Sequence, residues 1–509
     1  MTSTATTGHD GELWSGLERL RRLPDWLVAA ADPGRAAAAL RRHVPELAAG
    51  RVTLAGCDPW RFRLKGPTWD VLYRLALDEP GRGRRVVDLF GLVHAPGQAP
   101  PASAPAAPLG APGWRCALPE LGLDLGTVPA DGGLPALADL RDPERARALL
   151  EAGIRACSPA YADLRIARCR PLLLRCNPDS RATLRCQLGY PPQAAGRGWP
   201  EVVVVKTHRG DKGRNAWEAM RALWDSPLGG SGGEVRLAEP LAWIPERRVL
   251  VQGPIPAERT LTQLLRRSLR LGTPAALDEL RSALDRTAAA LAALHRRGPR
   301  HGTARTLDQE LDEAGRVAAR LAGPVPALAG AAGPLLARLA ALAAGTPADP
   351  DGPAHRSFRP GQVLLRDGGI GLIDFDGFCT AEPALDVALF RADLKDTGML
   401  VRLDGPPGRD RDLAMAARLE ELADLFLDRY ARHAPVSPRR VALWEAVDLL
   451  TCVLHSWTKV QPRRLATSRL LLERHLRAAG SDRGGAGTGG GGLTAVAGDA
   501  GARADGAGR

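Results

Sequence analysis

The stretch that decides the fold reads HRSFRPGQVLLRDGGIGLIDFD and runs from His355 to Asp376. It contains two short apolar segments separated by an Asp-Gly-Gly turn at 367–369. Short apolar segments joined by a glycine turn predict a β-hairpin. Such a hairpin would hold the polar loop that precedes it beside the acidic tip that follows it, which begins at Asp374. We therefore expect the functional centre of the protein at this hairpin.

This stretch resembles the aminoglycoside phosphotransferase and choline kinase-like family, whose pattern is H-G-D-x-x-x-x-N, a strand, a turn and then I-D-[FW]. His355 matches the first residue, and Asp374 matches the second, metal-binding Asp. Gln362 stands at the metal-binding Asn and offers the same amide oxygen on a longer arm. The resemblance implies that Asp374 and Gln362 hold magnesium on the phosphates of a nucleotide. It also implies that Asp386 either braces the loop at His355 or caps the next helix.

Two residues of the loop depart from the family pattern. Arg356 replaces the glycine, and Ser357 replaces the Asp that orients the acceptor hydroxyl or takes its proton in this family. A serine hydroxyl is neutral and a very poor base. Asp376 lies two residues beyond Asp374, on the same face of a strand end, and is a candidate substitute base. General-base help contributes about 10²–10⁴-fold to a rate, so we expect a slow enzyme unless another group replaces the lost Asp.

Upstream, EVVVVKTHRGDKGRNAWEAMRALW at 201–224 predicts a buried strand that delivers Lys206, followed by a helix. The resemblance implies that Lys206 contacts the α- and β-phosphates and that Glu218 on the helix pairs with this lysine. The preceding RCNPDSRATLRC predicts a hairpin in the place of the phosphate-covering loop, with Arg181 on the nucleotide side. Gln252 begins the linker that the resemblance makes the adenine-binding hinge.

The resemblance covers about 165–475 and implies an α+β, protein-kinase-like fold with a small β-rich lobe and a large helical lobe. Before it, helical and then strand periodicity predicts an α/β region of unknown role, and a Pro/Ala-rich segment is typical of a linker or long surface loop. The expected organisation is an N-terminal α/β region (1–95), a linker (96–113), the small lobe with its preceding segment (114–255), the helical lobe (256–480) and a disordered Gly-rich tail (481–509).

The bulk composition is that of a soluble globular protein, with 45% apolar and 25% charged residues among 509. We found no apolar run of membrane-spanning length and no secretory signal, so we expect a cytoplasmic protein with no membrane partner. The eight cysteines form no C-x-x-C pair, which favours reduced thiols over a metal site. The net charge of +12 comes from arginines spread along the chain rather than from a basic block. We therefore expect an anionic small ligand and not a nucleic acid.

Three functional hypotheses remain open from the sequence. The first is a phosphotransferase that uses ATP or GTP with magnesium and acts on a hydroxyl of a small molecule. The second is a catalytically inactive pseudokinase that keeps the fold and acts as a nucleotide-binding or regulatory module. The third is a nucleic-acid-binding protein, whose affinity would fall steeply with salt, and we rank it last.

Overall fold

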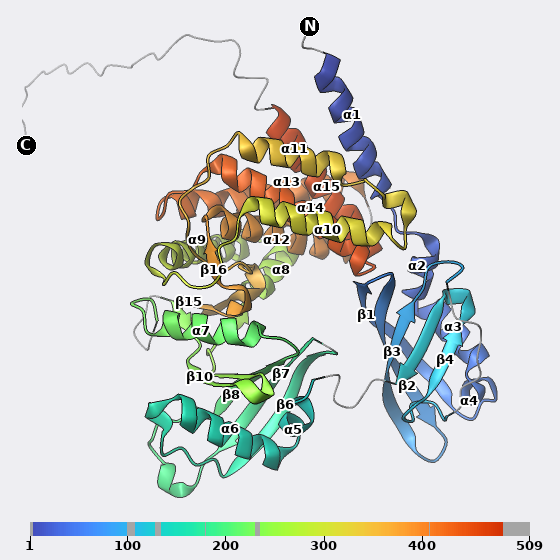
Figure 1. The fold of residues 1–509 in the computed structure, drawn as a ribbon, viewed down its shortest axis with the longest axis vertical. Helices are drawn as coiled ribbons and strands as arrows, with labels where there is room; N and C mark the ends of the chain where they lie inside the picture. The colour runs from blue at the N-terminus through green and yellow to red at the C-terminus, as the bar shows by residue number, and fades with distance from the viewer. Residues whose placement is uncertain are drawn as a thin grey trace, which may run out of the picture.

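The computed structural model describes residues 4–98, 107–127, 134–178, 180–229, 235–406 and 408–481. Figure 1 shows an N-terminal part with its own sheet, a small β-rich lobe and a large helical lobe, with both sheets on the same side of the helical lobe. The last two parts form the two-lobed, protein-kinase-like α+β fold that the sequence predicts.

The N-terminal part combines short helices with an antiparallel sheet in the order β1-β2-β3-β5-β4. Strands β1 to β3 confirm the three strands expected before residue 95, and β2 alternates buried and exposed residues because one face packs on the helices. The elements are α1 (Thr4–Arg19), α2 (Asp25–Ala30), α3 (Pro33–His43), α4 (Pro45–Ala48), β1 (Thr53–Lys65), β2 (Thr68–Glu79), β3 (Gly83–Val93), β4 (Arg115–Leu118) and β5 (Leu123–Thr127).

The predicted boundary at 96–113 is wrong, because the sheet continues beyond it. Strand β5 pairs with β3, and β4 pairs with β5, so residues 115–127 belong to the N-terminal sheet and not to the small lobe. Leu109, within the predicted linker, is buried, and its backbone N–H donates to Glu46 at 3.0 Å. The Pro/Ala-rich segment is therefore an insertion between two strands of one sheet. Its residues 99–106, and 482–509 of the predicted tail, lie outside the described residues.

The small lobe is an antiparallel sheet in the order β10-β11-β8-β7-β6. Its core is formed by alternate residues of these strands and by α6, whereas α7 lies between the sheet and the helical lobe (Figure 1). The elements are α5 (Leu137–Arg141), α6 (Pro143–Cys157), β6 (Arg168–Asn177), β7 (Arg181–Gly189), β8 (Val202–His208), α7 (Lys212–Trp224), β10 (Pro240–Ile244) and β11 (Val249–Gln252).

The large lobe is a helical bundle that carries two small sheets at the edge that faces the small lobe. The predicted hairpin is confirmed as β14 and β15, with Val363 opposite Leu372. The elements are β9 (Arg236–Leu237), β12 (Arg259–Thr260), α8 (Leu261–Leu271), α9 (Pro274–Arg297), α10 (Leu307–Ala322), α11 (Gly333–Ala344), β13 (Gly352–Ala354), β14 (Val363–Arg366), β15 (Gly369–Leu372), β16 (Cys379–Ala381), α12 (Ala384–Leu403), α13 (Arg409–Ala431), α14 (Pro438–Thr458) and α15 (Pro462–Ser481).

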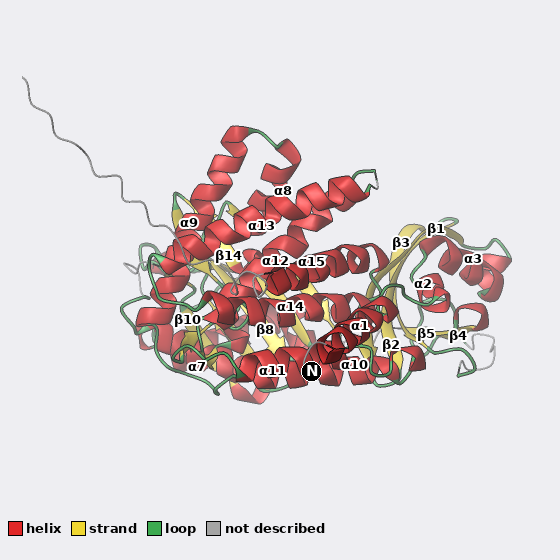
Figure 2. Ribbon diagram, turned by 90° about the horizontal axis from the view of Figure 1, so that it is seen from above, coloured by secondary structure: helices red, strands yellow, loops and turns green. Residues whose placement is uncertain are grey.

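The N-terminal part shares its hydrophobic core with the helical lobe, whereas the small lobe has a separate core between Leu134 and Val251. Helix α1 runs along the helical lobe and packs on α11 (Figure 2). Gly16 allows this approach, since a Cβ there would lie 2.3 Å from the main-chain oxygen of Ala331. The N-terminal part is thus built onto the helical lobe rather than attached by a free linker.

One stretch of the described chain, Pro326–Ala344, is long and apolar enough to cross a membrane by these two criteria, and 33% of it is buried. It comprises a 3-10 turn at Pro326–Leu328, further turns and the twelve-residue helix α11. A single stretch of this kind is weak evidence for a membrane span, because core helices of soluble proteins meet the same criteria.

Candidate active site

The β14–β15 hairpin places the two ends of the motif side by side. The backbone N–H of Ile373 donates to the main-chain oxygen of Gln362 at 3.2 Å, so Gln362 and Asp374 lie at the same end of the hairpin. Asp374 has left-handed backbone angles, with φ 76° and ψ 56°. This conformation turns the chain sharply out of β15, and it directs the Asp374 carboxylate towards the small lobe.

Lys206 on β8 crosses from the small lobe to this acidic tip. Its Nζ lies 3.0 Å from Asp374 Oδ1 and 3.3 Å from Asp376 Oδ1. Arg181, at the start of β7, donates to Asp376 Oδ2 at 3.3 Å and lies 3.8 Å from Asp374 Oδ1. The structure therefore brings together two cations from the small lobe and two carboxylates from the helical lobe, all four of them predicted as site residues.

These contacts keep Lys206 and Asp374 ionised. Burial alone would raise the pKa of Asp374, but the charges of Lys206 and Arg181 outweigh it and lower that pKa overall. Burial would likewise lower the pKa of Lys206, and the two carboxylates raise it instead. A carboxylate that stays charged can bind a hard cation, and an ammonium that stays charged can bind phosphate.

The loop before β14 is braced from below by Asp386 at the start of α12. This fully buried carboxylate accepts from the backbone N–H of His355 at 2.6 Å and of Arg356 at 2.7 Å. It also lies 3.0 Å from His295 Nε2 on α9. The bracing role that the resemblance implied for Asp386 is confirmed.

His355 and Ser357 shape the loop from inside. The His355 ring is buried against Phe358 and Phe375, its Nε2 lies 3.1 Å from the Ile373 oxygen, and burial lowers its pKa. The Ser357 hydroxyl donates to the Asp374 main-chain oxygen at 3.0 Å and lies 3.2 Å from His355 Nδ1. Both side chains hold the backbone around Asp374, which makes them positioning residues in this arrangement.

The predicted pairing of Lys206 with Glu218 is wrong. Glu218 is half exposed on α7, and its carboxylate lies 3.7 Å from His301 Nε2. The buried face of α7 is formed by small and apolar residues such as Ala216 and Ala219, and Glu218 projects from another face. Asn215 of the same helix makes the contact with the site instead, since its Nδ2 donates to the backbone oxygens of Asp376 and Phe378, both at 3.2 Å.

Gln252 lies at the connection between the lobes, and Gln362 lies at the start of the β14–β15 hairpin. Gln252 is the last residue of β11 and is buried, and the following linker leads to β12, which pairs with β14 of the helical lobe. The Oε1 atom of Gln362 is buried and has no hydrogen-bond partner among the described residues. This amide oxygen and the ionised carboxylate of Asp374 are both oxygen ligands of the kind that magnesium binds. No described group of three or more His, Cys, Asp and Glu residues forms a metal site.

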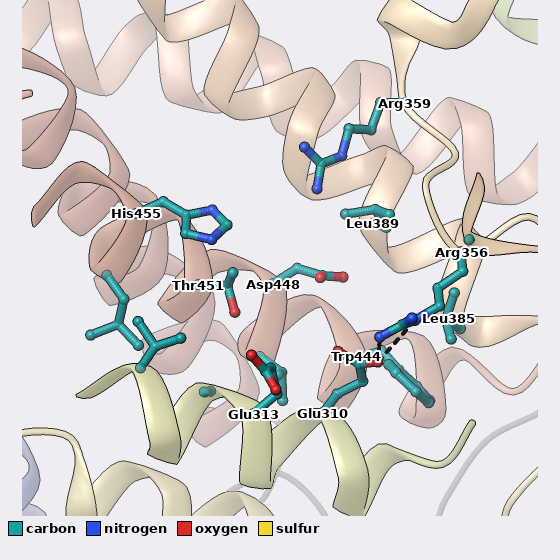
Figure 3. A pocket seen from close by; sticks show the side chains of 15 residues that line it. Glu310, Glu313, Arg356, Arg359, Leu385, Leu389, Trp444, Asp448, Thr451 and His455 are labelled. Atoms are coloured by element: carbon teal, nitrogen blue, oxygen red, sulfur yellow. Dashed lines mark hydrogen bonds and ion pairs between the residues drawn. The ribbon is translucent and has the colours of Figure 1, made fainter. Parts of the chain in front are cut away.

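A cavity of about 250 Å³ lies on the other side of the loop, between α10, α12 and α14. Figure 3 shows Glu310 joined to Arg356 at one end, with Asp448, Thr451 and His455 along α14. The Oδ2 atom of Asp448 is buried without a partner among the described residues, and burial raises the pKa of this carboxyl well above its ordinary value. A lining that combines apolar side chains with three carboxyl groups and two arginines suits a small ligand that carries hydroxyl groups.

Sequence reasoning missed Asn215, Glu310 and Asp448 as site residues. All three lie on helices whose apolar spacing predicts ordinary core packing, and none of them belongs to a recognised motif. One cue was available for Asp448, since an acidic residue between apolar positions of a buried helix calls for a partner or a ligand.

The two lobes and the contact of Lys206 with Asp374 at their junction agree with the arrangement that the family resemblance implies. Residues 259–444 match the model of the phosphotransferase enzyme family, which confirms the family resemblance for the segment from β12 into α14. None of the curated proteins searched matches the chain.

Similar solved structures include a choline kinase from Cryptosporidium parvum Iowa II, at 12% identity, 67% coverage of this chain, 97% coverage of that chain and a TM-score of 0.42. A glucosamine kinase in complex with glucosamine, ADP and inorganic phosphate has 18% identity, coverages of 70% and 90% and a TM-score of 0.45. An ADP-bound aminoglycoside phosphotransferase has 15% identity, coverages of 62% and 99% and a TM-score of 0.40.

Proposed function

We propose that this protein transfers a phosphoryl group from ATP or GTP to a hydroxyl of a small molecule, with magnesium as the cofactor. The observation that carries the proposal is the convergence of Lys206 and Arg181 from one lobe on Asp374 and Asp376 from the other. Phosphoryl transfer depends mainly on positioning and charge stabilisation, and this cluster supplies both signs of charge at the junction of two lobes.

Each cation of the cluster has a role once nucleotide is bound. Lys206 and Arg181 would exchange their carboxylate partners for phosphate oxygens, which also accept charge-assisted hydrogen bonds. Gln252 and the linker after it would contact the base, because this segment forms the connection between the lobes.

The released Asp374 and the orphaned oxygen of Gln362 would hold the magnesium ion. The ion neutralises charge on the phosphates when bound. One or two protein oxygens suffice for magnesium, which keeps several waters and binds phosphate oxygens as further ligands.

The acceptor hydroxyl would enter from the cavity on the far side of the loop. Asp448 and Glu310 line that cavity, so they would accept hydrogen bonds from the hydroxyls of the acceptor. The hydroxyl of Ser357 is taken by a main-chain oxygen, and Asp376 is not among the described residues that line the acceptor cavity. Transfer would therefore proceed with little general-base help and would be slow.

The first test is calorimetric titration of ATP, with and without magnesium, into the wild type and three variants. Lys206→Ala and Asp374→Ala should abolish magnesium-dependent binding. Glu218→Ala is the matched control, because this exposed residue lies on the neighbouring helix and contacts His301 instead of the cluster. Gln362→Ala should weaken binding only when magnesium is present.

Two results would contradict the proposal. One is the absence of any nucleotide binding by the wild type. The other is binding that Lys206→Ala and Glu218→Ala affect equally, since the cluster would then not be the nucleotide site.

A second candidate, a nucleotide-binding pseudokinase, is favoured by one observation. Ser357 stands at the position of the expected base and has no carboxylate. Its hydroxyl is hydrogen-bonded within the loop, so this side chain offers no free group to the acceptor. Ser357→Asp separates the candidates: a rise in transfer to a hydroxylated acceptor indicates a site that lacked only its base. If Ser357→Asp binds nucleotide but still transfers no phosphoryl group, the protein is a binding module.

A further inference from the structure

A second cavity, of about 820 Å³, lies between the N-terminal sheet and the two kinase-like lobes. One wall is β1, and the other walls are the β6–β7 hairpin, α10 and the end of α14. It shares Glu313, Val317 and His455 with the acceptor cavity, so the two cavities are neighbours that meet at these three side chains. Together the two cavities extend from the loop that carries Arg356 and Arg359 to strand β1 of the N-terminal part.

The lining of this second cavity is strongly basic. Arg61, Arg63 and Lys65 recur at every second position of β1 and so lie on one face of this edge strand. Across the cavity they are joined by three cations of the kinase-like lobes, namely Arg175, Arg320 and Lys459. Glu313 is the one acidic residue among the described lining residues.

These cations lack the acidic partners that other arginines of the same sheet possess. Arg74 and Arg84 are both paired with Asp residues, at 2.8 Å each. Within the described residues, Lys65 contacts Asp70 at 3.3 Å, while five cations form no ion pair: Arg61, Arg63, Arg175, Arg320 and Lys459. What sets these five cations apart is their place, since they lie on facing walls of one cavity.

Crowding of like charges is visible at both walls. Burial lowers the pKa of Arg61, and the charges of Arg63 and Arg175 lower it further. Burial and Arg464 lower the pKa of Lys459 in the same way. His455, where the two cavities meet, has its pKa lowered to about 3 by burial and by Lys459, so it adds no charge at neutral pH. A bound anion would relieve this repulsion.

We propose that the basic cavity binds the phosphate or carboxylate group of the acceptor, so that the acceptor is a small molecule with a hydroxyl at one end and an anionic group at the other. This inference rests on the proposed function, because it treats the acidic cavity beside the loop as the entrance of the hydroxyl. A polynucleotide fits less well, because the cavity is bounded on several sides. Its β1 wall also offers few aromatic side chains on which bases could stack, namely the exposed Trp60 and the buried Phe62.

The test is calorimetric titration of inorganic phosphate into the full chain. Arg61→Gln combined with Arg63→Gln, and separately Lys459→Gln, should each weaken phosphate binding by about tenfold or more, since each removes charge-assisted hydrogen bonds. Arg84→Gln is the control, because this exposed arginine of the same sheet is paired with Asp78. Lys206→Ala should retain phosphate binding, which separates this cavity from the nucleotide site.

A second arm asks whether the anion belongs to the acceptor. Glucose 6-phosphate should bind about tenfold more tightly than glucose, and the Arg61→Gln/Arg63→Gln variant should lose that preference. Equal binding of the two sugars, or phosphate binding lost only in Lys206→Ala, would overturn the inference. So would a short single-stranded oligonucleotide that binds with steep salt dependence while phosphate does not. If ATP binding fails and the phosphate results hold, the proposed function fails, and the cavity is still an anion site.

Discussion

Asp374 is the residue at which the parts of the candidate site meet. Its carboxylate contacts Lys206 of the small lobe, and its main-chain oxygen accepts from Ser357 of the loop. Its left-handed backbone, with φ 76°, costs on the order of 1–3 kcal/mol for a residue other than glycine. Strain of this kind persists where the surrounding contacts impose it. Here the contact with Lys206 and the contact with Ser357 act on the same residue, so the position of Lys206 and the conformation of the loop depend on each other.

At the same scale, Asp386 should be a main determinant of loop stability. Asp386→Ala leaves two buried backbone N–H groups and His295 without their acceptor, so we expect the free energy of unfolding to fall by about 3–5 kcal/mol. Asp386→Asn keeps one acceptor oxygen and should cost less. Chemical denaturation measures the loss, with Asp428→Ala as the control, because Asp428 forms an exposed pair with Arg432. A similar small loss in both alanine variants would contradict this role.

His455 should make stability depend on pH. Its pKa in the folded protein is lowered to about 3 by burial, against about 6.5 in an unfolded chain. The neutral ring thus contributes stability that is fully present above pH ~6.5 and is lost as the pH falls towards the folded value. Between pH 7 and pH 5 the wild type should lose about 2 kcal/mol more than His455→Gln.

Denaturation curves at the two pH values measure this difference. His355 shifts in the same direction, because burial lowers its pKa as well, so the variant should keep part of the pH dependence. Equal losses in the wild type and in His455→Gln would show that this ring does not stay neutral in the folded protein.

At the scale of elements, a buried ionic network joins α12, α13 and α14. Glu445 on α14 contacts Arg391 at 2.7 Å and also Lys395, both on α12, and these cations reach Glu420 on α13 at 3.0 and 2.9 Å. Burial would raise the pKa of Glu445, but Arg391 and Lys395 outweigh it and lower that pKa. The network fixes the register of the helices that carry the acceptor cavity.

Glu445→Ala should therefore destabilise the protein by about 3–5 kcal/mol, because it leaves two buried cations without this partner. Glu420→Ala should cost less, since Glu420 is a third exposed and water can replace it. Thermal unfolding of both variants tests the order. If Glu420→Ala proves the more damaging, the buried carboxylate is not the anchor of the network.

At the scale of the whole molecule, the N-terminal part and the helical lobe share one core. Trp457 of α14 is buried and donates through Nε1 to the Leu20 oxygen at 2.9 Å. The indole of Trp69 on β2 donates to the Trp457 oxygen at 3.4 Å and packs edge-on against Trp26. The basic cavity exists because this contact holds β1 near the end of α14.

Trp457→Ala should cost about 3–5 kcal/mol of stability and release the N-terminal helices. Limited proteolysis should then cut within α1 to α3 at a protease concentration that leaves the wild type intact. Trp457→Phe keeps most of the volume and should be cut more slowly than the alanine variant. Unchanged proteolysis of Trp457→Ala would mean that the two parts do not depend on each other.

Local patterns in the chain predicted much of this architecture. The apolar segments around the Asp-Gly-Gly turn became β14 and β15, and the valine run became β8 with Lys206 directed at the acidic tip. Each of these elements is specified by neighbouring residues, because strand alternation and turn chemistry operate over a few positions. The kinase-like fold and the cluster of Lys206, Arg181, Asp374 and Asp376 were implied by the family resemblance, which rests on the order of these elements.

Features that depend on distant partners could not be read in the same way. Helical periodicity does not state which face of α7 meets β8. Glu218 was expected to pair with Lys206, whereas Asn215 is the α7 residue that contacts the acidic tip, at Asp376. The edge of β3 could accept any strand, and β5 joined it from beyond a Pro/Ala insertion. The basic cavity combines β1 with α14 from the other end of the chain. Periodicity describes one segment at a time, whereas contacts between segments follow from burying all apolar surfaces at once, which depends on the complete fold.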